Sequence, residues 1–200
     1  PSEFLDPIHS YESFNDFFSR KLKVESRPIS QEEHSFVAPA DGRYRFFSCI
    51  EKTEGFYIKG QKFSLKKLLQ DKKLAKQYKN ASMLIARLCP VDYHRFHFPC
   101  DGIPTDSRLI NGTLSSVNPL AIHRNIHLFT ENKRMLTSIQ SEKFGNILYI
   151  EIGATNVGSI HQTFRPQQFM RKGDEKGYFS FGASALILLF EDPSIQFDKD

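Results

Sequence analysis

A series of short β-type segments, separated by glycine and proline, constrains the fold more than any other feature of this sequence. The segments are rich in β-branched and aromatic residues, as half-buried strands are. They cover residues 44–50, 56–59, 83–89, 126–130, 135–139, 147–153 and 184–190. Long helical patterns do not alternate with them, which disfavours a doubly wound sheet. The sequence therefore predicts an α+β fold with a mainly antiparallel β core and peripheral amphipathic helices, in a single domain over residues 1–200.

Two segments have helical periodicity. Residues 10–22 place five apolar side chains at helical spacing, which predicts one amphipathic helix. That helix either docks on the protein core, which we favour, or lies in a lipid interface. Ser64 and Asp71 are suitable N-caps for one or two short helices within residues 64–79.

Positive charge is concentrated in residues 61–79, which hold seven lysines against one aspartate, a net charge of +6 in a chain whose total is +4. The simpler interpretation is a solvated lysine face, and the alternative is attraction to an anionic membrane. No nucleic-acid-binding motif accompanies the lysines, so nucleic acid is not an expected partner. The longest apolar run, residues 185–190, is shorter than the ~20 residues that span a bilayer.

Cysteine and histidine spacing do not predict a metal site. Cys49, Cys89 and Cys100 form no CxxC pair, so we expect reduced thiols. His123 and His127 are spaced like metal ligands but have no acidic or cysteine partner in their motif.

Three stretches combine reactive side chains with turn-forming residues. They are VAPADG with Asp41, CPVDYHRFHFPCDG with His94 and His97, and GYFSFGASALILLFE with Ser184. Each is weak evidence alone: an aspartate before glycine is usually a turn residue, paired histidines usually pack, and GxSxG is absent.

Together these stretches resemble the phosphatidylserine decarboxylases, which process themselves to form a pyruvoyl group. The resemblance covers residues 11–197 and includes FNDFFSRKLK, SVNPLAI, IGATNVGSI and KGDEKGYFSFG. It implies self-cleavage between Ala183 and Ser184, with Ser184 as the nucleophile, His97 as its base and Asp41 as the acid that orients the base.

The resemblance also implies a carboxy-lyase that converts phosphatidylserine to phosphatidylethanolamine. Its cofactor is a covalent pyruvoyl group derived from Ser184, which serves as an electron sink. His94 is expected in the decarboxylation step, where it positions the substrate carboxylate or supplies a proton. Residues expected to shape the substrate site are Ser116, Asn118, Gly153, Asn156 and Gly158.

The partners implied are phosphatidylserine in an anionic membrane and the chain's own small cleaved fragment. A homo-oligomer and the cellular compartment stay open, and we expect peripheral membrane association. Family members extend beyond both ends of this sequence, which favours truncation at both ends.

The sequence departs from the family pattern around the processing serine. Ala183 stands where members usually have glycine, and Ala185 stands where they have serine or threonine. Because alanine restricts φ and adds a methyl group at the attacked residue, we expect slow or absent processing. A second alignment places the processing position at Ala183, but GYFSFGAS favours Ser184. The alternatives are a decarboxylase of a soluble amino acid and an unprocessed, non-catalytic lipid-binding relative.

Overall fold

The fold is known from a computed structural model, which describes residues 1–50, 57–58, 61–125, 127–155, 159–182, 184–192 and 194–197. Side chains are described for these residues except 57, 58, 61, 62, 119, 123 and 124. Among the described helices, none combines the length and apolar character needed to cross a membrane.

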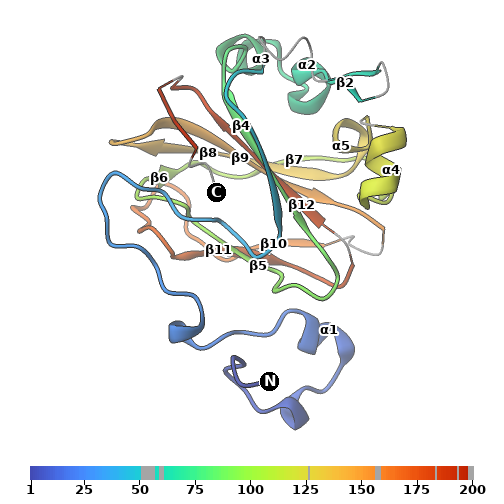
Figure 1. The fold of residues 1–200 in the computed structure, drawn as a ribbon, viewed down its shortest axis with the longest axis vertical. Helices are drawn as coiled ribbons and strands as arrows, with labels where there is room; N and C mark the ends of the chain where they lie inside the picture. The colour runs from blue at the N-terminus through green and yellow to red at the C-terminus, as the bar shows by residue number, and fades with distance from the viewer. Residues whose placement is uncertain are drawn as a thin grey trace.

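A large antiparallel sheet forms the centre of the molecule (Figure 1). Its strands, in spatial order, are β1 (Arg43–Phe47), β4 (Ser82–Leu88), β12 (Ser184–Phe190), β9 (Gly145–Gly153), β8 (Arg134–Ser141) and β6 (Ile103–Pro104), and β7 (Arg108–Ile110) also pairs with β8. The predicted α+β class with an antiparallel core is confirmed.

A second sheet covers one face of the large sheet. It consists of β10 (Ile160–Gln162), β11 (Glu175–Phe179) and β5 (Arg95–His97). Phe96 of β5 and Phe179 of β11 pack with ring centroids 4.9 Å apart, and both belong to the core between the two sheets. A separate short hairpin pairs β2 (Tyr57–Ile58) with β3 (Gln61–Lys62).

Helices cover the other face of the large sheet. They are α2 (Leu65–Leu69), α3 (Lys72–Gln77), α4 (Pro119–Arg124) and α5 (Leu128–Glu131), while η1 (Ile8–Ser10), α1 (Phe14–Phe18) and η2 (Val24–Ser26) lie in the N-terminal segment (Figure 1). The predicted N-caps are confirmed: Ser64 accepts from Lys67 N, and Asp71 accepts from Leu74 N. Buried Arg134 donates to the carbonyls of Lys67 and Leu68, which the end of α2 leaves without helical partners.

The central strand β12 is buried along its whole length. Ala185, Ile187 and Leu189 face the helices, whereas Leu186, Leu188 and Phe190 face the second sheet. Both faces of the strand are therefore apolar, which explains its unbroken hydrophobic run.

Two expectations from the sequence were wrong. Residues 126–130 were expected as a strand, but Leu128–Glu131 form α5, because a short apolar run does not distinguish the two periods. The helix expected over residues 10–22 is limited to Phe14–Phe18. Ser19 is its C-cap and donates its backbone N–H to the carbonyl oxygen of Asn15. Strands β3, β5, β6, β7 and β10 were missed because each has only two or three residues. Strand β11 is as long as β1 but was missed because its sequence EKGYF begins with two charged residues and a glycine.

Replacing Ile187 by alanine tests the role of β12. Ile187 is fully buried between strands on both sides and the helices on one face, so Ile187→Ala is expected to lower the free energy of unfolding by about 2–5 kcal/mol. Urea denaturation measures this change. Leu120→Ala in α4 is the control, because Leu120 is 75% exposed and should change stability by about 0.5 kcal/mol or less. Equal losses in the two variants would contradict a core role for β12.

Candidate active site

Three strand ends bring candidate residues to one end of the large sheet. Ser184 opens β12, opposite Leu88 of β4 on one side and Gly153 of β9 on the other. On the far side of β4, Gly42 lies so close to β4 that an added Cβ would stand 2.7 Å from the Arg87 carbonyl oxygen. This close approach places Asp41 at the same sheet end as Ser184, two strand spacings or roughly 10 Å away.

Ser184 is fully buried, and its Oγ has no hydrogen-bond partner among the described residues. Strand alternation puts its side chain on the same face as Leu186, in the core between the two sheets. A buried hydroxyl without a partner costs about 1–3 kcal/mol, and in native proteins such a group often has a chemical role. Burial together with the unpaired hydroxyl therefore makes Ser184 a candidate for a chemical role at this sheet end.

His94 lies beside the segment that leads into Ser184. Its Nδ1 is 2.9 Å from the Asp92 carbonyl oxygen, so Nδ1 carries the proton and donates to that oxygen. Its Nε2 is buried and has no partner among the described residues. The ring packs 4.0 Å from the ring of Phe18, and the backbone of Gly182 is close enough to affect its pKa.

Burial determines the charge of His94. It lowers the pKa of His94 to about 4, so the imidazole is neutral at physiological pH. A neutral ring with a proton on Nδ1 presents a lone pair at Nε2. His94 is thus suited to accept a hydrogen bond at Nε2, and is unsuited to attract a carboxylate by charge.

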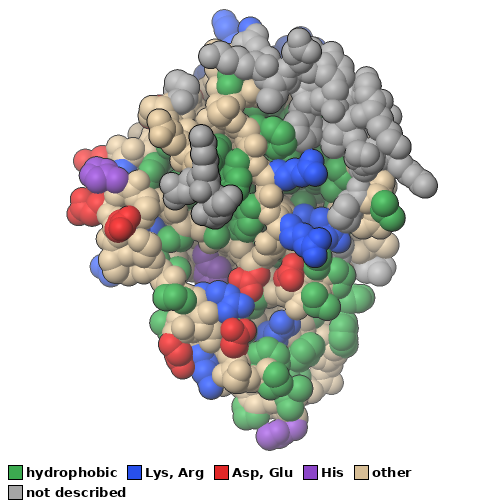
Figure 2. Space-filling model, viewed as in Figure 1, with side chains coloured by type: hydrophobic (Ala, Val, Ile, Leu, Met, Phe, Trp, Pro, Cys, Tyr) green, Lys and Arg blue, Asp and Glu red, His purple; other side chains and the backbone are tan. Residues whose placement is uncertain are grey.

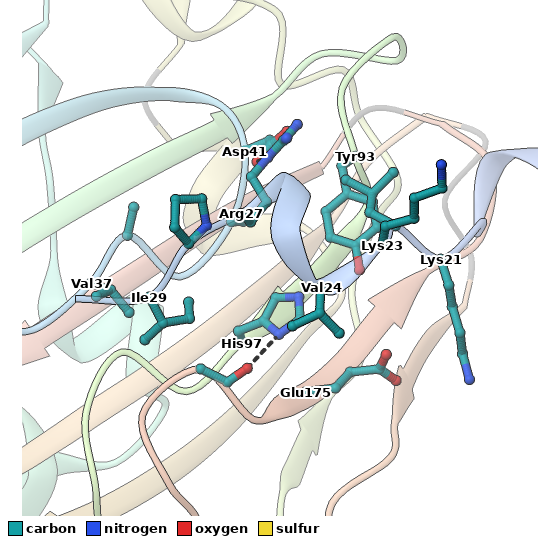
Figure 3. A pocket seen from close by; sticks show the side chains of 15 residues that line it. Lys21, Lys23, Val24, Arg27, Ile29, Val37, Asp41, Tyr93, His97 and Glu175 are labelled. Atoms are coloured by element: carbon teal, nitrogen blue, oxygen red, sulfur yellow. Dashed lines mark hydrogen bonds and ion pairs between the residues drawn. The ribbon is translucent and has the colours of Figure 1, made fainter. Parts of the chain in front are cut away.

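The side chain of His97 points away from the space between the two sheets. Phe96 faces the core between the sheets, and strand alternation directs His97 outward. Its Nδ1 donates to the Gly173 carbonyl oxygen at 2.9 Å, which leaves Nε2 as the acceptor (Figure 3). Burial also lowers the pKa of His97.

A cavity of about 440 Å³ contains both His97 and Asp41 (Figure 3). Other charged residues on its wall are Arg27 and Glu175, and the N-terminal segment contributes Lys21 and Lys23. Arg27 binds the Asp41 carboxylate through Nε at 2.8 Å and Nη2 at 2.5 Å, which raises the pKa of Arg27 above its usual value. The cavity wall therefore carries charges of both signs, with three basic and two acidic side chains.

The structure brings together two pairs of the predicted residues but not a hydrogen-bonded triad. Asp41 and His97 share the cavity, and Ser184 and His94 lie near the sheet end. Among the described residues, Asp41 bonds Arg27, His97 Nδ1 bonds Gly173, and Ser184 Oγ bonds nothing. The carbonyl oxygen of Gly173, and not the expected Asp41 carboxylate, therefore orients the His97 ring. The catalytic roles of these residues stay predictions.

The residues expected to bind substrate have local structural partners. Asn118 caps α4 by accepting from Ala121 N at 2.8 Å, and Ser116 Oγ accepts from Asn118 N at 3.3 Å. Gly153 lies opposite Ser184, and its carbonyl oxygen accepts from the buried side chain of Asn132. Contact of these residues with a substrate stays a prediction. Asn156, Gly158 and the cleavage residue Ala183 lie outside the described residues.

Comparison with known proteins identifies the family. The pattern of the phosphatidylserine decarboxylase family matches residues 14–200. The chain belongs to this family. It is 52% identical over 198 residues to the phosphatidylserine decarboxylase proenzyme of Chlamydia pneumoniae, 55% to that of Chlamydia muridarum and 54% to that of Chlamydia trachomatis serovar L2. Each match covers 99% of this chain and 66% of the relative, so the chain spans about two thirds of their length.

In this member of the phosphatidylserine decarboxylase family, sequence reasoning missed three charged residues near the site. Arg27 pairs with Asp41 across 14 positions, and Glu151 pairs with Lys176 between the two sheets. The sequence contained a signal for the pair of Glu151 and Lys176, because the charged Glu151 interrupts the otherwise apolar run of residues 147–153. No pattern in the sequence points to Arg27 as the partner of Asp41.

The neutrality of buried His94 predicts a specific pH dependence of stability. The unfolded chain binds a proton at His94 near pH 6.5, whereas the folded chain does so only near pH 4, so acid favours unfolding between these values. We expect the free energy of unfolding to fall by about 3 kcal/mol more in the parent chain than in His94→Gln between pH 6.5 and pH 4. Urea denaturation across this range measures the difference. Parallel curves for the two proteins would contradict a buried neutral His94.

Proposed function

We propose that this chain is part of a precursor that cleaves itself between Ala183 and Ser184 and then decarboxylates phosphatidylserine to phosphatidylethanolamine. One observation carries the proposal: Ser184, which the family resemblance makes the processing serine, is fully buried at the start of a central strand, and its hydroxyl has no hydrogen-bond partner among the described residues. The similar proteins of Chlamydia are named proenzymes, which supports a precursor.

The surroundings of residue 184 fit a pyruvoyl group. Small residues flank it, with Gly153 opposite in β9 and Ala185 next in β12. A pyruvoyl group at this position would supply a carbonyl that takes up the electron pair left behind when carbon dioxide departs. Strand β12 pairs along its length with β4 and β9, so a fragment beginning at residue 184 would stay in the sheet after cleavage.

The chain's own residues would handle the protons. For the cleavage step, the family resemblance assigns Ser184 as nucleophile and His97 as base. In this structure His97 faces the cavity that also holds Asp41 and its partner Arg27, so His97 must turn toward the space between the sheets to reach Ser184 Oγ. In decarboxylation, His94 would relay a proton from water through Nε2 to the substrate carbon that loses carbon dioxide. Its Nε2, without a hydrogen-bond partner among the described residues, supports this role, and the neutral ring leaves that nitrogen available at physiological pH.

The mass of the purified protein under denaturing conditions tests self-cleavage. We expect two fragments, the second starting with a pyruvoyl group at residue 184, and a single full-length mass for Ser184→Ala. Ser180→Ala is the matched control in the same segment and should cleave like the parent. A single mass for the parent would contradict self-cleavage and would favour an unprocessed relative, as would be expected if the processing position were Ala183, which has no hydroxyl.

The substrate is tested on the cleaved protein. Carbon dioxide should be released from carboxyl-labelled phosphatidylserine in vesicles and not from free serine. Release from the free amino acid alone would select a decarboxylase of soluble substrates.

We also propose that the N-terminal segment is the membrane-facing surface. Its exposed apolar side chains include Ile8 at 59%, Phe14 at 62% and Val24 at 92%, and exposed Lys21 and Lys23 lie among them. Hydrophobic, basic and acidic side chains are intermixed on this part of the surface in Figure 2. The segment also lines the cavity that holds His97, so lipid bound there would lie near the site.

The lysine face of α2 and α3 lies at the opposite end of the molecule (Figure 1). Lys66, Lys67, Lys72 and Lys73 are exposed there, as expected for either interpretation of these lysines. One flat membrane cannot contact both ends at once. The N-terminal segment offers exposed apolar side chains, whereas its charges are mixed, with five acidic and four basic side chains in residues 1–27. Insertion of apolar side chains, which charge attraction alone does not provide, therefore favours the N-terminal segment as the membrane-facing surface.

Vesicle binding distinguishes the two surfaces. Ile8→Ser combined with Val24→Ser removes two exposed apolar side chains and should weaken binding to vesicles of phosphatidylserine and phosphatidylcholine about tenfold or more. The variant with Lys66, Lys67, Lys72 and Lys73 changed to glutamine should lose about twofold or less. Vesicle co-sedimentation measures both, and a larger loss from the lysine variant would move the membrane surface to α2 and α3.

A further inference from the structure

A charged pair is enclosed between the two sheets. Lys176 of β11 and Glu151 of β9 are both fully buried and joined by a short salt bridge through Glu151 Oε1. Lys176 Nζ also donates to Thr137 Oγ1 at 3.0 Å and to Gln162 Oε1 at 2.8 Å. The three donors of the ammonium group are therefore all used.

A β-bulge directs Lys176 into this space. Glu175 pairs with His97 and Gly177 pairs with the adjacent Phe96, so Lys176 is the extra residue between them. Bulges redirect side chains and are common beside active sites. Aromatic rings line the space as well, with Nζ 4.8 Å from the ring centroids of both Tyr149 and Phe164.

Stability alone does not account for this pair. Removing two charges from water costs several kcal/mol per ion, and an apolar pair of similar volume is often as stable or more stable. Glu151 moreover has a second oxygen, Oε2, that is buried and has no hydrogen-bond partner among the described residues. A carboxylate held by one oxygen, with the other left open, is arranged to accept a further hydrogen bond.

Ser184 is the neighbour that supplies such a donor. Ser184 pairs with Gly153, and Leu186 pairs with Glu151, so Ser184 and Glu151 are diagonal neighbours on adjacent strands. Both side chains face the second sheet, because they alternate with Ala185 and Ile152, which face the helices. Diagonal neighbours are about 7–8 Å apart, within reach of a long side chain. One group is an unpartnered acceptor and the other an unpartnered donor.

We propose that Glu151, held in place by Lys176, accepts a hydrogen bond from the Ser184 hydroxyl in the precursor and orients Oγ for attack on the preceding carbonyl. The inference rests on the proposed self-cleavage and adds a positioning residue to it. The side chain of Gln162 also lies close enough to Glu151 to lower the pKa of its carboxyl group, although Gln162 Nε2 makes no well-formed hydrogen bond among the described residues. Because a carboxylate oxygen accepts two hydrogen bonds, Gln162 does not displace Ser184.

Lys176 has a distinct task in this arrangement. Burial raises the pKa of Glu151, which favours its neutral form, and the ammonium group of Lys176 opposes that change. Lys176 therefore helps to keep the carboxylate ionised, and a charged acceptor makes the stronger hydrogen bond.

The test measures the cleavage rate of the full-length precursor in hydroxylamine, which splits the ester formed at residue 183. Glu151→Gln should slow cleavage at least tenfold. The double variant Glu151→Leu with Lys176→Met should also cleave at least tenfold more slowly than the parent. Its melting temperature should equal or exceed that of the parent, because both buried charges are removed together. Glu33→Gln breaks the exposed pair with Lys143 and is the control that should cleave at the parent rate.

The same substitutions in a Ser184→Cys background distinguish an effect on the orientation of the nucleophile from an effect on folding. A thiol is a weak hydrogen-bond donor and a better intrinsic nucleophile, so Glu151→Gln should slow this background threefold or less. Equal slowing in both backgrounds would show a structural role and overturn the inference, as would parent-rate cleavage by both Glu151 variants. A parent chain that hydroxylamine does not split would overturn the proposed self-cleavage itself, and the inference with it.

Discussion

The pairing of β12 with β4 and β9 is the constraint on which the rest of the structure depends. This strand is bonded on both sides and covered on both faces, so its first residue has a fixed direction and depth. Ser184 is that first residue, and its environment is set by the strand and not by a mobile loop. Its neighbours in the sheet decide which groups can reach its hydroxyl.

Strand alternation sorts the candidate residues into two environments. Phe96 and Ser184 face the space between the sheets, whereas His97 faces the cavity with Asp41. The cavity is lined by charged groups and borders the N-terminal segment. The space between the sheets is enclosed by side chains, so an unpaired polar atom there is costly and its hydrogen bonds are strong.

Burial also determines the protonation of the groups near Ser184. It makes His94 neutral and gives Nε2 a free lone pair, and it makes the charge of Glu151 depend on Lys176. These effects arise from the same cause, which is burial. The ion pair of Arg27 and Asp41 differs from them because both of its side chains are partly exposed.

Local patterns in the sequence determined the antiparallel α+β class, the capped helices after Ser64 and Asp71, and the central strand from Ser184 to Phe190. These features depend on neighbouring residues, whose spacing and side-chain chemistry are visible in the chain. The helix at 128–131 and the short strands were decided by tertiary packing, because their own periodicity is too short to specify a structure. Pairing Glu151 with Lys176 required the register of two sheets and a bulge, and only the folded chain brings such distant residues together.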